Sequence, residues 1–228
     1  MVQKSAAGSA KRGRPRAYDP GAALEKATLT FWDAGFAATS LDDLAAATAM
    51  NRPSLYAAFG DKEALYRTVL EGYRAGARAA MKEALDAALP LREGLRRVYA
   101  SALAMYLPAG RPPRGCFMIG TAVTEAVQDD AVRDSLNEGL REIDRAFEAR
   151  FRQARDRGEL PADADPAALA RLASGVLYFL AVRSRAGEPR AVLEATAEAG
   201  VALLTGAASR AGGKAASRRA RNRSGSTR

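Results

Sequence analysis

The chain has 228 residues, with 35 Lys and Arg against 26 Asp and Glu, which gives a formal charge of +9. It contains no histidine and one cysteine. Histidine-based catalysis, an intrachain disulfide and a Cys-rich zinc site are therefore excluded. No stretch approaches the roughly 18 apolar residues of a membrane span, and the basic N-terminus lacks the apolar core of a secretory signal. We expect a cytoplasmic protein without cofactor or metal.

The positive charge lies at the two ends of the sequence. Residues 1–17 carry five bases and residues 207–228 carry seven, with no acid in either segment, so 18–206 is slightly acidic. Both tails lack large apolar residues and are predicted to be disordered, either as solubilising ends or as arms that bind phosphates. The N-terminal tail contains Arg-Gly-Arg-Pro, which resembles the core of an AT-hook. We therefore expect Arg14 and Arg16 to enter a minor groove.

Between the tails, the spacing of apolar residues at every third or fourth position predicts an all-α fold. Asp19 and Pro20 start the first helix and Gly35 ends it. Ser40 and Asn51 are N-caps of the next two short helices. About nine helices are expected, at 20–34, 41–48, 52–59, 62–88, 91–107, 115–128, 130–157, 166–185 and 189–205.

Residues 39–59 carry the most informative pattern: a short helix, a tight turn and a second short helix. Leu41 and Leu44 face inward from the first helix, Leu55 and Phe59 from the second, and Met50 fills the turn. Such a unit is typical of a helix-turn-helix, whose second helix enters the major groove.

The segment from Ala17 to about Tyr73 resembles the DNA-binding domain of the TetR family of regulators. At one position, Ala49, the turn usually has Gly, because that residue tends to a left-handed conformation. Ala there costs about 1 kcal/mol unless the turn relaxes. The matching motifs are Ala34-Gly35-Phe36, Thr39-Ser40-Leu41-x-x-Leu44-Ala45, Ser54-Leu55-Tyr56-x-x-Phe59 and Asp61-Lys62-Glu63-Ala64-Leu65.

Within this motif each polar residue has a predicted role. Arg52 can bind guanine O6 and N7 bidentately. Tyr56 and Lys62 are expected to contact phosphates. Thr39 and Ser40 lie at a helix N-terminus, which favours a phosphate. The residues predicted to contact DNA are Arg14, Arg16, Thr39, Ser40, Asn51, Arg52, Pro53, Ser54, Tyr56 and Lys62.

Pro53 and Ser54 complete the first turn of the second helix. Pro53 stiffens it and can touch a thymine methyl, and Ser54 can bind a base or a phosphate. Plainer interpretations stay open: Ser40 serves as a cap in any case, Arg52 and Lys62 could be solvated charges, and Tyr56 could be partly core.

The resemblance implies four segments: a basic arm (1–17), a helix-turn-helix domain (18–62), a ligand-binding and dimerisation domain (63–206) and a basic tail (207–228). Apolar stripes and small residues on the last two helices predict a four-helix interface around a two-fold axis, although they also suit intrachain packing. The predicted interface residues are Leu169, Leu172, Val176, Phe179, Leu193, Ala197, Gly200 and Leu204.

The resemblance also implies a cavity for a small effector, which we expect to be apolar. Aromatic and neighbouring residues from 91–185 are candidates for its wall, although such spacing equally suits a packed core. The predicted lining residues are Tyr99, Leu103, Tyr106, Phe117, Met118, Thr121, Phe147, Phe151 and Tyr178.

Cys116 lies at a predicted helix N-terminus near Arg111 and Arg114. Helix N–H groups and cations lower the pKa of a thiol, so Cys116 is a candidate sensor of electrophiles or oxidants. The alternative is a small buried apolar residue.

The function expected from these features is that of a homodimeric repressor, released from a palindromic operator by an effector. The helix at 62–88 would act as a lever between cavity and DNA. The alternative is a nucleoid-type protein that coats DNA through its tails. A helical scaffold or an enzyme is a third class, but no pair of nucleophile and base is visible.

Overall fold

The computed structural model describes residues 19–206, and all regular structure in this range is helical. Arg14, Arg16 and both basic tails lie outside the described residues. The elements are α1 (Pro20–Ala34), α2 (Leu41–Thr48), α3 (Arg52–Phe59), α4 (Lys62–Ala84), α5 (Leu91–Tyr106), the π-helical turn η1 (Met118–Ala122), α6 (Val123–Glu125), α7 (Asp130–Asp156), α8 (Pro166–Arg185) and α9 (Arg190–Leu204).

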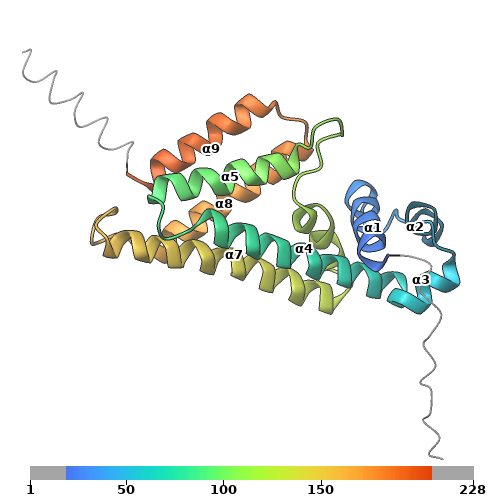
Figure 1. Ribbon diagram of the computed structural model, residues 1–228. Coiled ribbons are helices and arrows are strands. Elements are labelled where there is room, and N and C mark those ends of the chain that lie inside the picture. The colour runs from blue at the N-terminus through green and yellow to red at the C-terminus, as the bar shows by residue number, and fades with distance from the viewer. Residues whose placement is uncertain (1–18, 207–228) are drawn as a thin grey trace, which may run out of the picture.

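The helices form a small head and a larger body (Figure 1). The head consists of α1, α2 and α3 at one end of the molecule. Helix α4 starts in the head and runs along α7 through the body. Helix α8 packs on α7 and α9, and α9 also packs on α5. One helix thus belongs to both parts.

Local sequence signals explain how the head forms. The Asp19 carboxylate accepts a hydrogen bond from the backbone N–H of Gly21, and Pro20 occupies the first turn of α1. The buried face of α1 includes Ala27 and Phe31, both 0% exposed. Phe31 packs edge-on against Tyr66 of α4, with ring centroids 5.3 Å apart. Removal of these apolar side chains from water fixes the head on the start of α4.

Two elements differ from the prediction. Helix α4 ends at Ala84 rather than near 88, because the chain turns before Pro90, with the Leu89 N–H donating to the Asp86 carbonyl. The segment predicted as one helix at 115–128 is a π-turn followed by the three-residue α6. In that turn the Thr121 hydroxyl donates to the Phe117 carbonyl, which competes with the regular backbone bond.

Helix α8 is the described helix whose length and apolar composition would suit a membrane span. Its apolar face is used inside the fold, because Ala173, Leu177 and Leu180 are buried in the core. Arg183 and Arg185 lie in its last turn. Core packing therefore accounts for part of the apolar composition of α8, whereas Leu172, Phe179 and Val182 remain exposed.

Candidate DNA-binding and ligand-binding sites

Helix α2 starts with a reciprocal capping box. The Asp43 backbone N–H donates to Ser40 Oγ at 3.1 Å, and the Ser40 backbone N–H donates to Asp43 Oδ2 at 2.8 Å. The Ser40 hydroxyl also donates to Asp43 Oδ2 at 2.6 Å, and this bond, together with the one from the Ser40 backbone N–H, lowers the pKa of the Asp43 carboxyl. Ser40 is exposed and acts as the cap that the sequence predicts.

The turn between α2 and α3 keeps the left-handed residue. Ala49 has φ 57° and ψ 31°, and it is the non-glycine residue with positive φ among residues 19–206. The Met50 N–H donates to the Ala45 carbonyl at 3.1 Å, and the Met50 side chain is buried. The turn has therefore not relaxed, and Ala49 carries the predicted strain.

The first turn of α3 faces solvent. Asn51 caps the helix, with its Oδ1 accepting from the Ser54 N–H at 2.8 Å. Arg52 and Pro53 are exposed, Ser54 is half-buried and Tyr56 is 48% exposed. Leu55, between them, is buried and anchors the helix to the head. These five predicted residues lie together on one short helix.

Arg52 is held by a residue that sequence reasoning missed. Asp42 of α2 accepts from Arg52 Nε at 2.8 Å and from Arg52 Nη2 at 2.5 Å. The guanidinium lowers the pKa of the Asp42 carboxyl through these hydrogen bonds and by charge attraction. Ten positions separate the two residues, so only the packing of α2 on α3 reveals the pair.

Two predicted phosphate contacts point into the protein. Thr39 is 1% exposed, and its hydroxyl donates to the Gly35 carbonyl at 2.6 Å. Its side chain presents nothing to DNA, which corrects the prediction. Lys62 Nζ donates to the Phe36 and Thr39 carbonyls, each at 3.0 Å, and lies 4.1 Å from the Phe36 ring centre. Two of its three N–H groups are used, so any phosphate contact falls to the third.

A cavity with a volume of about 490 Å³ lies between α4 and α7. Its wall differs from the predicted apolar pocket, because five cationic side chains line it. Of the nine predicted lining residues only Met118 contributes. The wall comprises Arg74, Ala77, Arg78, Met81, Lys82, Leu85, Met118, Gly139, Glu142, Ile143, Arg145, Ala146, Ala149, Arg150 and Gln153.

A smaller cavity of about 50 Å³ lies deeper and includes Tyr106, Met118 and Tyr178 from the predicted set. The remaining predicted residues line neither of these two cavities. Each is at most 2% exposed and packs in the core, as the alternative interpretation held. They are Tyr99, Leu103, Phe117, Thr121, Phe147 and Phe151.

Cys116 is buried, and the predicted thiolate is not supported. Burial raises the pKa of its thiol, although hydrogen bonds from Tyr73 and neighbouring groups act in the opposite direction. The Tyr73 hydroxyl lies 3.2 Å from Sγ. Arg114 instead packs its guanidinium 4.0 Å from the Trp32 ring. The expected lowering of the thiol pKa is therefore wrong, because desolvation outweighs the nearby donors.

The head is joined to the body through Trp32. Its indole N–H donates to the Gly115 carbonyl at 3.2 Å, and its own carbonyl accepts from Arg185 of α8 at 3.1 Å. Nearby, the Tyr66 hydroxyl of α4 lies 2.8 Å from Thr121 Oγ1 in η1. Since η1 also supplies Met118 to the cavity wall, cavity and head share this element.

The predicted dimer residues differ between the two helices: those on α8 are at least partly exposed, whereas those on α9 are buried. Leu172 and Phe179 of α8 are exposed, and Leu169 and Val176 are half-buried. Leu193, Ala197, Gly200 and Leu204 of α9 are buried within the chain, so they offer no surface to a partner. A Cβ at Gly200 would lie 3.1 Å from a Val176 methyl, which shows that its smallness serves the packing of α9 on α8. The outward apolar residues of α9 are Val192 and Leu203.

Comparison with known proteins places both parts of the chain. Residues 23–69 match the family described as "Bacterial regulatory proteins, tetR family", and residues 90–199 match "Tetracyclin repressor-like, C-terminal domain". The Escherichia coli HTH-type transcriptional repressor ComR is 33% identical over 176 residues, which cover 77% of this chain and 84% of ComR. The uncharacterized Bacillus subtilis regulator YezE is 29% identical over 160 residues, covering 70% and 82%.

Among solved structures, a cysteine mutant of the TetR family regulator CifR, complexed with 26-base-pair double-strand operator DNA, superposes with a TM-score of 0.75. It is 36% identical, and the match covers 82% of this chain and 98% of CifR. Regulators of this family are soluble cytoplasmic DNA-binding proteins without enzymatic activity. From its head, its body and these relatives, the chain belongs to the TetR family of DNA-binding transcriptional regulators.

Proposed function

We propose that this chain is a homodimeric repressor that binds a palindromic operator through α3 and leaves it when an effector occupies the α4–α7 cavity. The observation that carries the proposal is the exposed first turn of α3, in which Arg52 is held at the surface of a helix-turn-helix. The proposal keeps the division into a DNA-binding segment (18–62) and a ligand-binding segment (63–206).

Arg52 is suited to read a base because Asp42 fixes its orientation. Asp42 occupies Nε and one side of Nη2, which leaves the Nη1 edge of the guanidinium for guanine O6 and N7. Pro53, Ser54 and Tyr56 lie on the same short helix as Arg52. We propose that they contact a thymine methyl, a base or phosphate, and a phosphate respectively. Asn51 acts through its cap, which shapes the helix start.

Dimerisation is supported by the exposed apolar face of α8 and α9. Leu172, Phe179 and Val182 follow one another along α8 and are 45–62% exposed, and Val192 and Leu203 lie on α9. A two-fold pairing of this face removes these side chains from water and presents two copies of α3. Two recognition helices about 34–36 Å apart reach successive major grooves, which requires an inverted repeat. Association with the nucleoid follows from operator binding.

Release follows from the position of α4. This helix forms one wall of the cavity and starts in the head, where Leu65 and Tyr66 are buried. An effector that binds the form with displaced heads more tightly shifts the population toward it. The size of that shift is limited by the difference between the effector's two affinities.

The experiment that tests this function is selection of bound duplexes from a random pool with the full chain. The expected result is enrichment of an inverted repeat whose half-sites are about one helical turn apart. If bound duplexes show no common sequence, the chain coats DNA without sequence preference, as the nucleoid-type alternative holds, and the proposal is wrong.

A further inference from the structure

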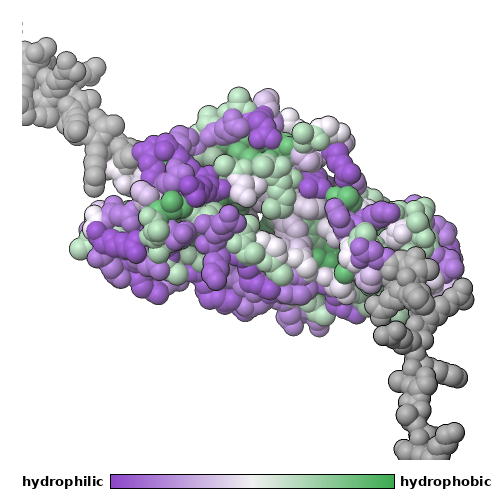
Figure 2. All heavy atoms as spheres, in the orientation of Figure 1, coloured by the Kyte–Doolittle hydropathy of each residue, from purple (hydrophilic) through white to green (hydrophobic). Residues whose placement is uncertain are grey.

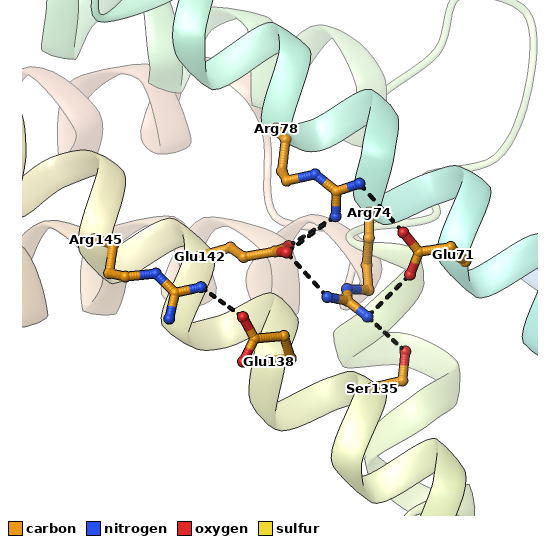
Figure 3. Close-up of polar contacts among 7 residues, drawn as sticks. All are labelled: Glu71, Arg74, Arg78, Ser135, Glu138, Glu142 and Arg145. Atoms are coloured by element: carbon orange, nitrogen blue, oxygen red, sulfur yellow. Dashed lines mark hydrogen bonds and ion pairs between the residues drawn. The ribbon is translucent and has the colours of Figure 1, made fainter.

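A network of charged residues ties α4 to α7 (Figure 3), and three of its members, Arg74, Arg78 and Glu142, line the cavity. Arg74 and Arg78 of α4 both donate to Glu142 Oε1 of α7, each at 3.0 Å. Arg74 also donates to Ser135 Oγ at 3.1 Å. Both arginines bond Glu71 of their own helix as well. Glu142 is thus the carboxylate through which α7 holds two cations of the lever helix.

The cavity wall as a whole carries an excess of positive charge. Its five cations are Arg74, Arg78, Lys82, Arg145 and Arg150, whereas Glu142 is the sole carboxylate among its lining residues. Carboxylates outside the lining pair with four of these cations: Glu71 with Arg74 and Arg78, Glu138 with Arg145, and Glu159 with Arg150. Lys82 forms no ion pair with any residue in 19–206. In Figure 2 hydrophilic residues predominate on the surface of α7, in keeping with the charged character of this side of the body. An anion inside the cavity is therefore attracted from several sides.

Arg150 adds a second, independent sign of a missing partner. It is 2% exposed, and its Nη2 donates to the Leu89 carbonyl at 2.7 Å and lies 3.3 Å from Glu159 Oε1. Its Nε and Nη1 are buried and have no hydrogen-bond partner, and neither has Nε of Arg74. Unpaired buried donors on a cation are costly and call for an acceptor.

The inner side of the cavity is apolar. Met81, Met118 and Ile143 line both the large cavity and the smaller one behind it. The smaller one continues toward Val98 and Leu177. A molecule that fills this space therefore meets both cations and methyl and thioether groups.

We propose that the effector is an amphipathic organic anion. Its acid group binds Arg74 and Arg78, Lys82 and Arg150 farther along the same wall add attraction, and its apolar part lies against Met81, Met118 and Ile143. This inference rests on the proposed function and names the ligand class of that same site. The acid group replaces Glu142 as the partner of Arg74 and Arg78. Helix α4 then loses its ion pairs to α7, and its N-terminal end moves the head.

The test uses two fluorescent probes that share an aromatic frame and differ in charge: the anion 8-anilinonaphthalene-1-sulfonate and neutral N-phenyl-1-naphthylamine. Each is titrated into the free, full-length protein. We expect the anion to bind on the order of tenfold more tightly, because hydrogen bonds to charged groups are the strong ones. Equal affinities, or no binding of the anion, would overturn the proposal.

Substitutions of cavity-wall residues test where the anionic probe binds. Arg150→Gln and Lys82→Gln are each expected to weaken the anion several-fold and to leave the neutral probe unchanged. Arg141→Gln, an exposed position on α7 outside the cavity wall, is the matched control and should change neither. Because Lys82 is exposed, its variant stays informative even where Arg150→Gln fails to fold. Anion binding that survives Lys82→Gln and any folded Arg150→Gln protein contradicts the assignment.

Glu142→Gln gives the sharpest outcome, since it removes the carboxylate that competes with the ligand. We expect this variant to bind the anion several-fold more tightly, the opposite sign from the cation variants. Weaker or unchanged binding would show that Glu142 does not compete with the ligand. It would contradict the replacement of Glu142 by the acid group. Operator affinity without any probe is measured in parallel. Failure of the unsubstituted protein to bind any operator would refute the proposed function, whereas operator binding with probe affinities insensitive to these charges would refute this inference alone.

Discussion

The contacts within the head and the contacts within the body join residues at different separations along the chain. In the head, the bonds that shape the DNA-binding surface join near neighbours, such as Ser40 with Asp43 and Asn51 with Ser54. In the body, the cavity network joins Arg74 to Glu142, 68 positions apart. The DNA-binding surface is therefore formed by a short, continuous segment of the chain. The cavity wall, in contrast, forms only when helices that are distant in the sequence pack together.

The largest effect should come from the body, by breaking the dimer. Val182→Asp places a charge on the exposed apolar face of α8, where Val182 is 53% exposed. A charge buried in an interface without a partner opposes association. Loss of the second half-site should then lower operator affinity on the order of a thousandfold. Ultracentrifugation and operator titration measure both effects.

Val127→Asp is the matched control for this variant. Val127 is 74% exposed and lies in the sequence between α6 and α7, on neither α8 nor α9. It should leave the dimer and operator affinity unchanged. If Val182→Asp remains a dimer with full affinity, the proposed interface is wrong.

The joint between the two regions gives the next effect. Gly115 has φ +64°, and a Cβ there would lie 2.5 Å from the Ala181 backbone oxygen. Gly115→Ala should lower the free energy of unfolding by about 3 kcal/mol, from strain and overpacking together. Gly158→Ala, with φ +73° and open space around it, should lose about 1 kcal/mol from strain alone. Denaturant unfolding compares them, and equal losses would mean that the joint is not tightly packed.

Cys116 tests whether the body shields its thiol. Because burial raises the pKa of this thiol, little thiolate forms near neutral pH, and it gains population only as the pH rises through the raised value. Alkylation by iodoacetamide at pH 8 should be at least about tenfold slower in the folded protein than in the unfolded one. Equal rates would restore the prediction of an activated sensor.

The smallest effect belongs to the head and is purely local. Ala49→Gly removes the left-handed strain from the folded state, and this gain exceeds the cost of the greater conformational entropy of Gly in the unfolded chain. The free energy of unfolding should therefore rise by about 0.5–1 kcal/mol. Ala46→Gly, inside α2 and exposed, should instead make unfolding easier by about 1 kcal/mol. Thermal melts measure both. Destabilisation by Ala49→Gly would show that the turn is not strained.

The contrast also explains how much could be predicted from the sequence. The caps Asp19, Ser40 and Asn51 and the buried face of α1 follow from local patterns, and the structure confirms them. The motif itself was predicted, because its apolar spacing is local. Asp42 was missed, since its partner Arg52 lies on the next helix and no local rule pairs them.

In the body, periodicity located helices but not their partners. An apolar residue at helical spacing packs equally well in the core or against a ligand. The sequence therefore predicts Phe147 and Phe151 in a cavity wall, whereas the structure places them in the core. The same ambiguity misplaced Leu193 and Leu204. The cationic cavity wall depends on α4 and α7 lying side by side, which the sequence does not reveal.

The most direct test of the account is to repeat the selection of bound duplexes with Arg52→Ala. The account predicts the same inverted repeat with one base position in each half-site randomised, and a loss of about 1–3 kcal/mol per half-site on the original operator. Arg97→Ala, at another exposed and ion-paired arginine, which lies on α5 of the body, should retain every position. A repeat that is unchanged by Arg52→Ala, with undiminished affinity, would contradict the claim that α3 reads DNA through this side chain.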